Sequence, residues 1–184
     1  MPFALGTSAL SAIPRASLTT LRASLVRDMG DGFATVLQEA GYAGGESVLA
    51  AMRDWCAANG VGAPETLAYS QFQVAAARFF ADTGWGGVSL EPIGDAAVAF
   101  DSSDWAEADP AAKMPYPSCY YTVGMLADVF GRVAGGPMQC LEVECRSVGA
   151  ERCRFLLASP EVIGHVYQRM AAGVGYAEAL KELA

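Results

Sequence analysis

The stretch that decides the predicted fold is residues 137–158, PMQCLEVECRSVGAERCRFLLA. It contains two runs typical of β-strands, residues 138–146 and 152–158, on either side of a break at residues 148–150 that contains Gly149. Two such runs around a short glycine-containing segment predict an antiparallel hairpin. Three of the five cysteines of the chain fall in this hairpin: Cys140, Cys145 and Cys153.

Outside the hairpin, the spacing of apolar residues predicts mostly helices. Apolar residues at three- and four-residue steps predict helices at residues 16–40, 46–58, 64–82, 119–133, 160–172 and 176–183. Gly30 and Gly32 interrupt the first helix, and Gly41, Gly44 and Gly45 are expected to end it. Ser118 and Ser159 are the expected caps of the helices that follow them.

A second hairpin is predicted upstream, with strands at residues 88–90 and 96–101, followed by a loop or lid at residues 102–117. Two hairpins separated by a helix indicate an α+β fold, a four-stranded antiparallel sheet with helices on one face. We expect an irregular lead-in over residues 1–15 and a single domain over residues 16–184.

Composition excludes several classes of function. A chain of 184 residues fits one domain with a full-sized core. The formal net charge of −8 argues against a nucleic-acid surface. No apolar run approaches the roughly 18 to 20 residues of a membrane span, and the start of the chain lacks a signal-peptide layout. We therefore expect a cytoplasmic protein, in which an odd number of cysteines favours metal binding or free thiols over disulfides.

Cysteines from separate elements indicate a metal site. Cys119 stands where a helix is expected to begin, and a helix N-terminus stabilises a thiolate. Cys145 and Cys153 flank the hairpin turn, so that their side chains can converge. Thiolates bind zinc well, and a structural zinc site takes four protein ligands. The alternative is that these residues are simply buried cysteines of the core.

The fourth ligand stays open on spacing alone. In a regular strand Cys140, Glu142 and Glu144 share one face and Cys145 lies on the other. Glu142 and Cys145 can converge only if the strand bulges or twists near its end. Three thiolates and one carboxylate would leave the site negative, and nearby arginines are expected to offset that charge: Arg146, Arg152 and Arg154.

Residues 131–161, GRVAGGPMQCLEVECRSVGAERCRFLLASPE, resemble the signature of the 4-vinyl reductase domain family. The resemblance extends over residues 16–170 and includes Cys119. The family is similar to the sensor domains of aromatic-responsive activators, archaeal hydrocarbon-binding proteins, a bacteriochlorophyll-biosynthesis protein and subunits of TRAPP vesicle-tethering complexes. It implies an α+β fold that binds small molecules or serves in assembly.

The resemblance also implies a ligand set. The aromatic-sensing relatives hold zinc with three cysteines and a glutamate, a pattern that falls here on Cys119, Glu142, Cys145 and Cys153. Phenol-sensing members fix the ligand hydroxyl with a histidine and a tryptophan. The only histidine here is His165, beyond the hairpin, and Phe100 lies about where the tryptophan is expected. The resemblance therefore implies a less polar pocket than a phenol site.

A pocket needs apolar walls with few polar groups. The candidate walls come from the third helix, the second strand and the helix after Cys119: Phe72, Phe79, Val98, Phe100, Tyr120, Val123 and Met125. The alternative is that these residues are plain core.

Catalysis has little support in the sequence. No glycine-rich phosphate loop follows a strand, and no nicotinamide or flavin motif is present. His165 is interpreted as a surface or packing residue. Acidic residues crowd one loop region and are interpreted as solvated: Glu91, Asp95, Asp101, Asp104, Glu107 and Asp109. We expect a non-enzyme.

The expected function is therefore the binding of a small hydrophobic or aromatic molecule, as sensor or carrier, by a domain with a structural zinc ion. A homodimer through the apolar N-terminal helices is expected. The alternatives are a protein-interaction module like the TRAPP subunits and an auxiliary protein of tetrapyrrole synthesis.

Overall fold

The fold is described from a computed structural model, which covers residues 10–183. Most of the predicted lead-in, residues 1–9, lies outside the described part. Residues 10–14 have no regular secondary structure, and the first helix begins at Arg15.

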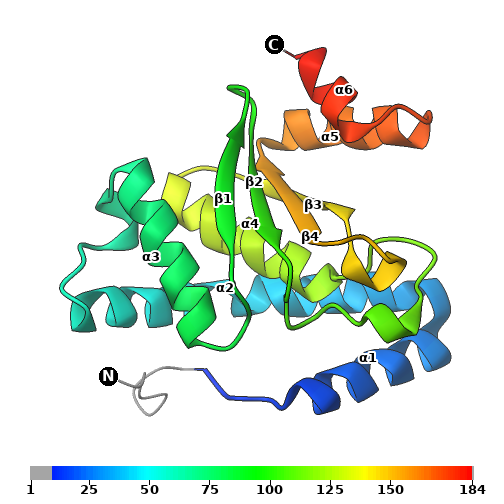
Figure 1. The fold of residues 1–184 in the computed structure, drawn as a ribbon, viewed down its shortest axis with the longest axis horizontal. Helices are drawn as coiled ribbons and strands as arrows, with labels where there is room; N and C mark the ends of the chain where they lie inside the picture. The colour runs from blue at the N-terminus through cyan, green and yellow to red at the C-terminus, as the bar shows by residue number, and fades with distance from the viewer. Residues whose placement is uncertain (1–9, 184) are drawn as a thin grey trace.

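A four-stranded antiparallel sheet lies at the centre of the protein (Figure 1). Its strands are β1 (Ser89–Ile93), β2 (Ala97–Ser102), β3 (Gln139–Glu144) and β4 (Cys153–Ala158). The spatial order is β1-β2-β4-β3, so the two hairpins join through their second strands. The predicted α+β class, the antiparallel sheet and both hairpins are confirmed.

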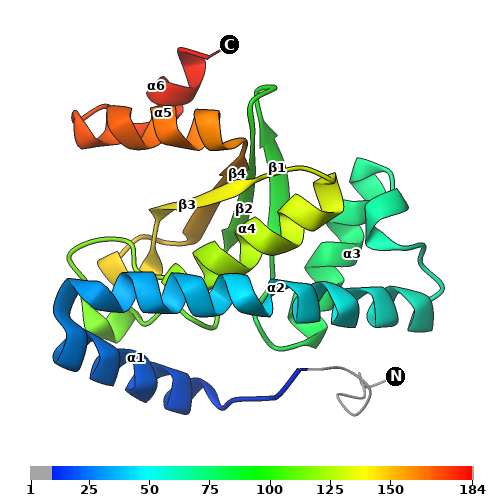
Figure 2. The same ribbon diagram turned by 180° about the vertical axis from the view of Figure 1, so that it is seen from behind.

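Helices cover one face of the sheet in successive layers (Figures 1 and 2). α4 (Tyr120–Ala134) packs directly on the strands, and α3 (Tyr69–Asp82) lies beside β1. α2 (Phe33–Ala58) crosses the outer side of α4, and α1 (Arg15–Met29) runs outside α2. In the described residues no helix combines the length and the apolar character that crossing a membrane requires.

The opposite face of the sheet is covered by α5 (Pro160–Ala171) and α6 (Tyr176–Lys181), as Figure 2 shows. The prediction of helices on one face only was wrong. Ala99 and Leu156 point away from α4, and both are fully buried beneath these two helices. Central strands that are apolar on both faces need a cover on both.

α2 is longer than the sequence indicated, because Gly41, Gly44 and Gly45 do not end it. A Cβ atom at Gly41 would lie 1.9 Å from the backbone oxygen of Tyr121, and that of Gly124 would lie 1.9 Å from the backbone oxygen of Gln38. The glycines thus permit a close crossing of α2 and α4. The break expected at Gly30 and Gly32 is confirmed by a 3-10 turn between α1 and α2.

Helix starts were predicted with mixed success. The expected helix at residues 64–82 divides into a 3-10 turn, Pro64–Thr66, and α3. Ser159 does cap α5, and its Oγ accepts a hydrogen bond from the backbone N–H of Val162. Ser118 does not cap α4, since the capping position is held by Cys119.

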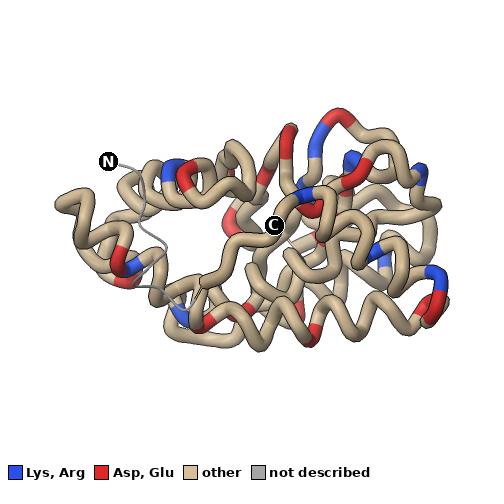
Figure 3. The backbone as a smooth tube through the Cα atoms, turned by 90° about the horizontal axis from the view of Figure 1, so that it is seen from below, with Lys and Arg blue, Asp and Glu red and all other residues tan. Residues whose placement is uncertain are grey.

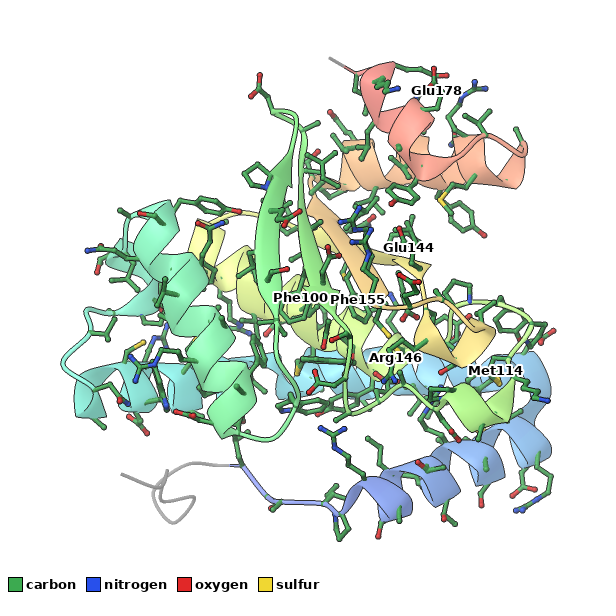
Figure 4. All side chains as sticks on the ribbon, viewed as in Figure 1. Phe100, Met114, Glu144, Arg146, Phe155 and Glu178 are labelled. Atoms are coloured by element: carbon green, nitrogen blue, oxygen red, sulfur yellow. The ribbon has the colours of Figure 1, made fainter. Side chains whose placement is uncertain are left out.

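An aromatic cluster fills the space between the sheet and the covering helices α3 and α4. Phe100 on β2 and Phe155 on β4, both labelled in Figure 4, lie on paired positions with ring centroids 6.0 Å apart. Trp105 packs against both rings at 5.2 Å and 6.3 Å. Phe80 from α3 packs against Phe100 and Trp105 from the other side. These rings form the apolar centre beside which the candidate site lies.

Candidate metal centre

Four side chains converge at the junction of α4 with the second hairpin: Cys119, Glu142, Cys145 and Cys153. All are buried, and each offers one ligand atom within 4.8 Å of the others. The Sγ atoms of Cys119 and Cys145 lie 3.8 Å apart. Sulfurs bound to one tetrahedral zinc ion at about 2.3 Å lie about 3.8 Å from each other. The side chains are therefore already spaced as zinc ligands.

A bulge in β3 makes this convergence possible. Glu142 pairs with Phe155 and Glu144 with Arg154, so Val143 is an extra residue in the ladder. After a bulge the alternation of side chains shifts by one position. Glu142 and Cys145 consequently face the same side, as the bulge predicted for this strand requires.

The same bulge turns Glu144 to the other face of the sheet (Figure 4). Its carboxylate accepts hydrogen bonds from Arg152 Nε at 3.0 Å and from Tyr176 Oη at 2.5 Å. Arg154 is paired with Asp101 through two hydrogen bonds, at 2.8 Å and 2.6 Å. Arg152 and Arg154 are thus engaged with acids on the side of α6, and the prediction that they offset the charge of the metal site was wrong.

The carboxylate of Glu142 is only half satisfied by the protein. Its Oε2 accepts a 2.8 Å hydrogen bond from the backbone N–H of Cys119, at the positive end of α4. Its Oε1 is buried and has no hydrogen-bond partner among the described residues. A buried carboxylate oxygen without a partner is costly, and a bound cation would remove that cost.

Ionisation of the cluster points the same way. Burial raises the pKa of Glu142 well above its ordinary value. Hydrogen bonding to Cys145 and Cys153, together with burial, also raises the pKa of Cys119. The pKa of Cys145 is lowered, because the thiols of Cys119 and Cys153 stabilise its thiolate. A dication would permit further groups to ionise, and three thiolates with one carboxylate suit zinc.

The other residues considered as ligands lie elsewhere. Cys140 belongs to the apolar core, and its burial raises the pKa of its thiol. Glu144 is turned away by the bulge. His165 lies between α5 and α6, where its Nε2 is 3.2 Å from the backbone oxygen of Ala179 and 3.1 Å from Glu182 Oε2. It is a packing residue, as interpreted.

The structure gathers most of the predicted ligand-binding residues into one apolar cluster. Its members are Phe72, Phe79, Phe100, Val123 and Met125. Val98 packs against this cluster and also lines an open groove of about 400 Å³ at the end of the sheet. Tyr120 instead packs against Phe33, with ring centroids 5.4 Å apart. Their role in ligand binding stays a prediction.

Sequence reasoning missed two residues of the loop at residues 103–119. Trp105 is fully buried, and its Nε1 donates a 2.7 Å hydrogen bond to Thr122 Oγ1. Glu107 is buried and accepts hydrogen bonds from the backbone N–H groups of Tyr121 and Thr122, so it caps α4. Its interpretation as a solvated acid was wrong, as was that of Asp101. A tryptophan within a polar loop was the available signal.

Comparisons with known proteins agree with this architecture. Residues 103–158 match the sequence model of the 4-vinyl reductase domain, and this segment contains all four candidate ligands. The predicted resemblance to that domain family is thereby confirmed over this segment. No curated protein sequence matches the chain.

Three solved structures share the fold. The phenol-responsive sensory domain of the transcription activator PoxR is 16% identical, with a TM-score of 0.64 over 83% of this chain and 77% of that one. A trafficking protein particle complex subunit 3 from Naegleria fowleri, covalently bound to palmitic acid, is 10% identical, with a TM-score of 0.59 over 78% and 91%. A vinyl-4-reductase family protein from Methanocaldococcus jannaschii is 19% identical, with a TM-score of 0.50 over 81% and 83%.

Proposed function

We propose that this protein binds a small hydrophobic or aromatic molecule, as sensor or carrier, and that a structural zinc ion stabilises the binding domain. One observation carries the proposal: four buried ligands join the start of α4 to the β3–β4 hairpin, and both elements contact the same aromatic cluster. Zinc supplies coordination of these side chains. Four protein ligands leave it no open position for chemistry, which supports a structural role and a non-enzyme.

The aromatic cluster supports an apolar ligand rather than a phenol. The indole N–H of Trp105 is paired with Thr122 Oγ1, and the hydroxyl of Thr122 donates to Glu107 Oε2 at 2.6 Å. Both polar groups next to the rings are therefore already satisfied. A ligand hydroxyl would be buried there without a partner, at a cost that an unsubstituted aromatic molecule avoids.

Thermal unfolding in the presence of candidate ligands tests this function. We expect toluene or ethylbenzene to raise Tm as concentration increases, because a ligand that binds only the folded state stabilises it. Phenol at the same concentration should raise it less. Native mass spectrometry after gentle purification would identify a co-purified ligand, and visible absorbance would favour a tetrapyrrole instead. No shift with any compound and no bound molecule would contradict the proposal.

The surface of α1 and α2 supports the proposed homodimer. Large apolar side chains are exposed there: Leu21 at 52%, Met29 at 45%, Val36 at 37% and Tyr42 at 56%. Exposed apolar side chains gathered on neighbouring helices are typical of an interface. The mass in solution, measured by light scattering, tests this proposal, and a monomer at micromolar concentration would contradict it.

The proposed location is the cytoplasm, because all five cysteines are free thiols and a thiolate zinc site needs a reducing compartment. A second candidate function is protein assembly, which the fold shared with the trafficking complex subunit favours. Figure 3 shows Lys and Arg residues spread over several segments, which gives no support to a nucleic-acid surface. A stably co-purified protein partner, without a small molecule, would favour the assembly role.

A further inference from the structure

Arg22 is a buried arginine on an otherwise exposed helix. It is only 5% exposed, whereas its neighbour Leu21 on α1 is 52% exposed. An arginine is rarely buried unless its guanidinium is paired. The partners of Arg22 therefore show what holds α1 against the rest of the protein.

Those partners all lie in the loop that precedes α4. Arg22 Nη1 donates to the backbone oxygen of Glu107, and Nη2 donates to the backbone oxygen of Ser118 at 2.9 Å and to its Oγ at 3.0 Å. Nε lies 3.9 Å from Glu107 Oε1, close enough for electrostatic attraction. The guanidinium thus binds both ends of the loop that contains Trp105.

The contacts continue into the candidate metal centre. Ser118, which Arg22 holds, is followed directly by Cys119, whose backbone N–H donates to Glu142. Glu107, which Arg22 also holds, accepts hydrogen bonds from the first turn of α4. One cationic side chain of α1 therefore fixes the position of the segment that carries the first candidate ligand.

We propose that Arg22 is a positioning residue for the metal centre, and that metal binding and the docking of α1 are energetically coupled. The inference rests on the proposed zinc site. Without Arg22, the backbone at Ser118 loses two of its anchors, and Cys119 must be ordered when the ion binds. Coupling is reciprocal, so an ion that orders Cys119 also favours the docked position of α1.

Replacement of Arg22 tests the first half of the proposal. We expect Arg22→Ala to weaken zinc binding about 10–100-fold, the usual effect of removing a residue that supports a metal ligand. Competition with a chromophoric chelator measures that affinity, and the visible spectrum of the cobalt(II) form reports the geometry of the thiolates. Arg22→Lys should recover part of the affinity, because it restores the charge but not the fork of donors.

Arg27 offers a matched control on the same helix. Its side chain is 69% exposed and pairs only with the adjacent Asp28 among the described residues. Arg27→Ala should leave zinc affinity and the cobalt spectrum unchanged. Equal affinities for Arg22→Ala and Arg27→Ala would overturn the coupling while leaving the zinc site intact. A wild-type protein that gives no cobalt–thiolate spectrum would overturn the zinc site and the coupling together.

Hydrogen exchange tests the second half and needs no variant. We expect chelation of the metal from the wild-type protein to accelerate backbone exchange across Arg15–Met29. In Arg22→Ala the same residues should exchange rapidly with or without metal. Exchange of α1 that does not change when metal is removed from the wild type would overturn the proposal, whatever the variants show.

Discussion

The backbone N–H of Cys119 donates a 2.8 Å hydrogen bond to the carboxylate of Glu142, which lies 23 residues later in the chain. This bond joins the start of α4 to β3 through protein groups alone. It also leaves the second oxygen of Glu142, Oε1, buried without a hydrogen-bond partner among the described residues. The candidate metal centre therefore has a structural basis that precedes any bound ion.

Cysteine replacement should separate the metal ligands from the core cysteine. We expect Cys145→Ala to bind almost no zinc, while Cys140→Ala keeps about one ion per chain. Both cysteines are buried near the end and the start of the same strand, at 1% and 7% exposure, so loss of packing is similar. Metal content by plasma mass spectrometry is the measurement. Equal zinc contents would contradict the assignment.

The two glutamates of β3 should differ in the same way. Glu142→Gln should lower zinc affinity at least about tenfold (about 1.4 kcal/mol), because a neutral amide is a weaker ligand than a carboxylate. Glu144→Gln should leave zinc affinity unchanged and cost less than about 1 kcal/mol of stability, since its ion pair with Arg152 is partly exposed. Competition titrations of both variants would show the difference, and reversed effects would refute the role of the bulge.

Metal removal should lower stability without abolishing the fold. An ion present at about 1,000 times its Kd contributes about 4 kcal/mol to the free energy of unfolding. Chelation should therefore lower Tm, while the far-ultraviolet circular dichroism stays native at low temperature, because the aromatic cluster remains. The Cys145→Ala variant is the control, since chelator should not change its Tm. A Tm of the wild type that does not respond to chelator would argue against structural zinc.

The crossing of α2 and α4 should be sensitive to a single methyl group. In Gly124→Ala the new Cβ would meet the backbone of Gln38 at 1.9 Å, so the helices must separate. We expect a loss of about 3 kcal/mol. Gly164→Ala on α5, where nothing lies within 4 Å, should instead gain about 0.5–1 kcal/mol. Urea denaturation measures both, and equal stabilities would show that the crossing is looser than described.

Tyr176 should control the attachment of the C-terminal helices. Its hydroxyl donates to Glu144 and accepts a 3.0 Å hydrogen bond from Arg154 Nη1. Tyr176→Phe should cost about 1–2 kcal/mol and accelerate hydrogen exchange in α5 and α6. Tyr167→Phe is the control, because that side chain is 63% exposed. Unchanged exchange in the Tyr176 variant would mean that apolar packing alone holds these helices.

Local patterns predicted much of the fold and part of the site. The alternation in the hairpins, the break at Gly30 and the cap at Ser159 depend on neighbouring residues, and all three appear in the structure. The three glycines of α2 misled the prediction, since a glycine-rich segment ordinarily ends a helix. Packing against α4 stabilises the helix there, and two of those glycines make the close approach possible.

The sequence by itself determined a four-stranded antiparallel sheet and, through the resemblance, a set of four candidate ligands. Only the tertiary structure decided that Glu142 rather than Glu144 faces the thiols, because one extra residue in β3 reverses the alternation. It alone also buried Arg22 and Glu107 against the start of α4. Such contacts join residues 85 positions apart, and no local pattern records which distant charges burial will pair.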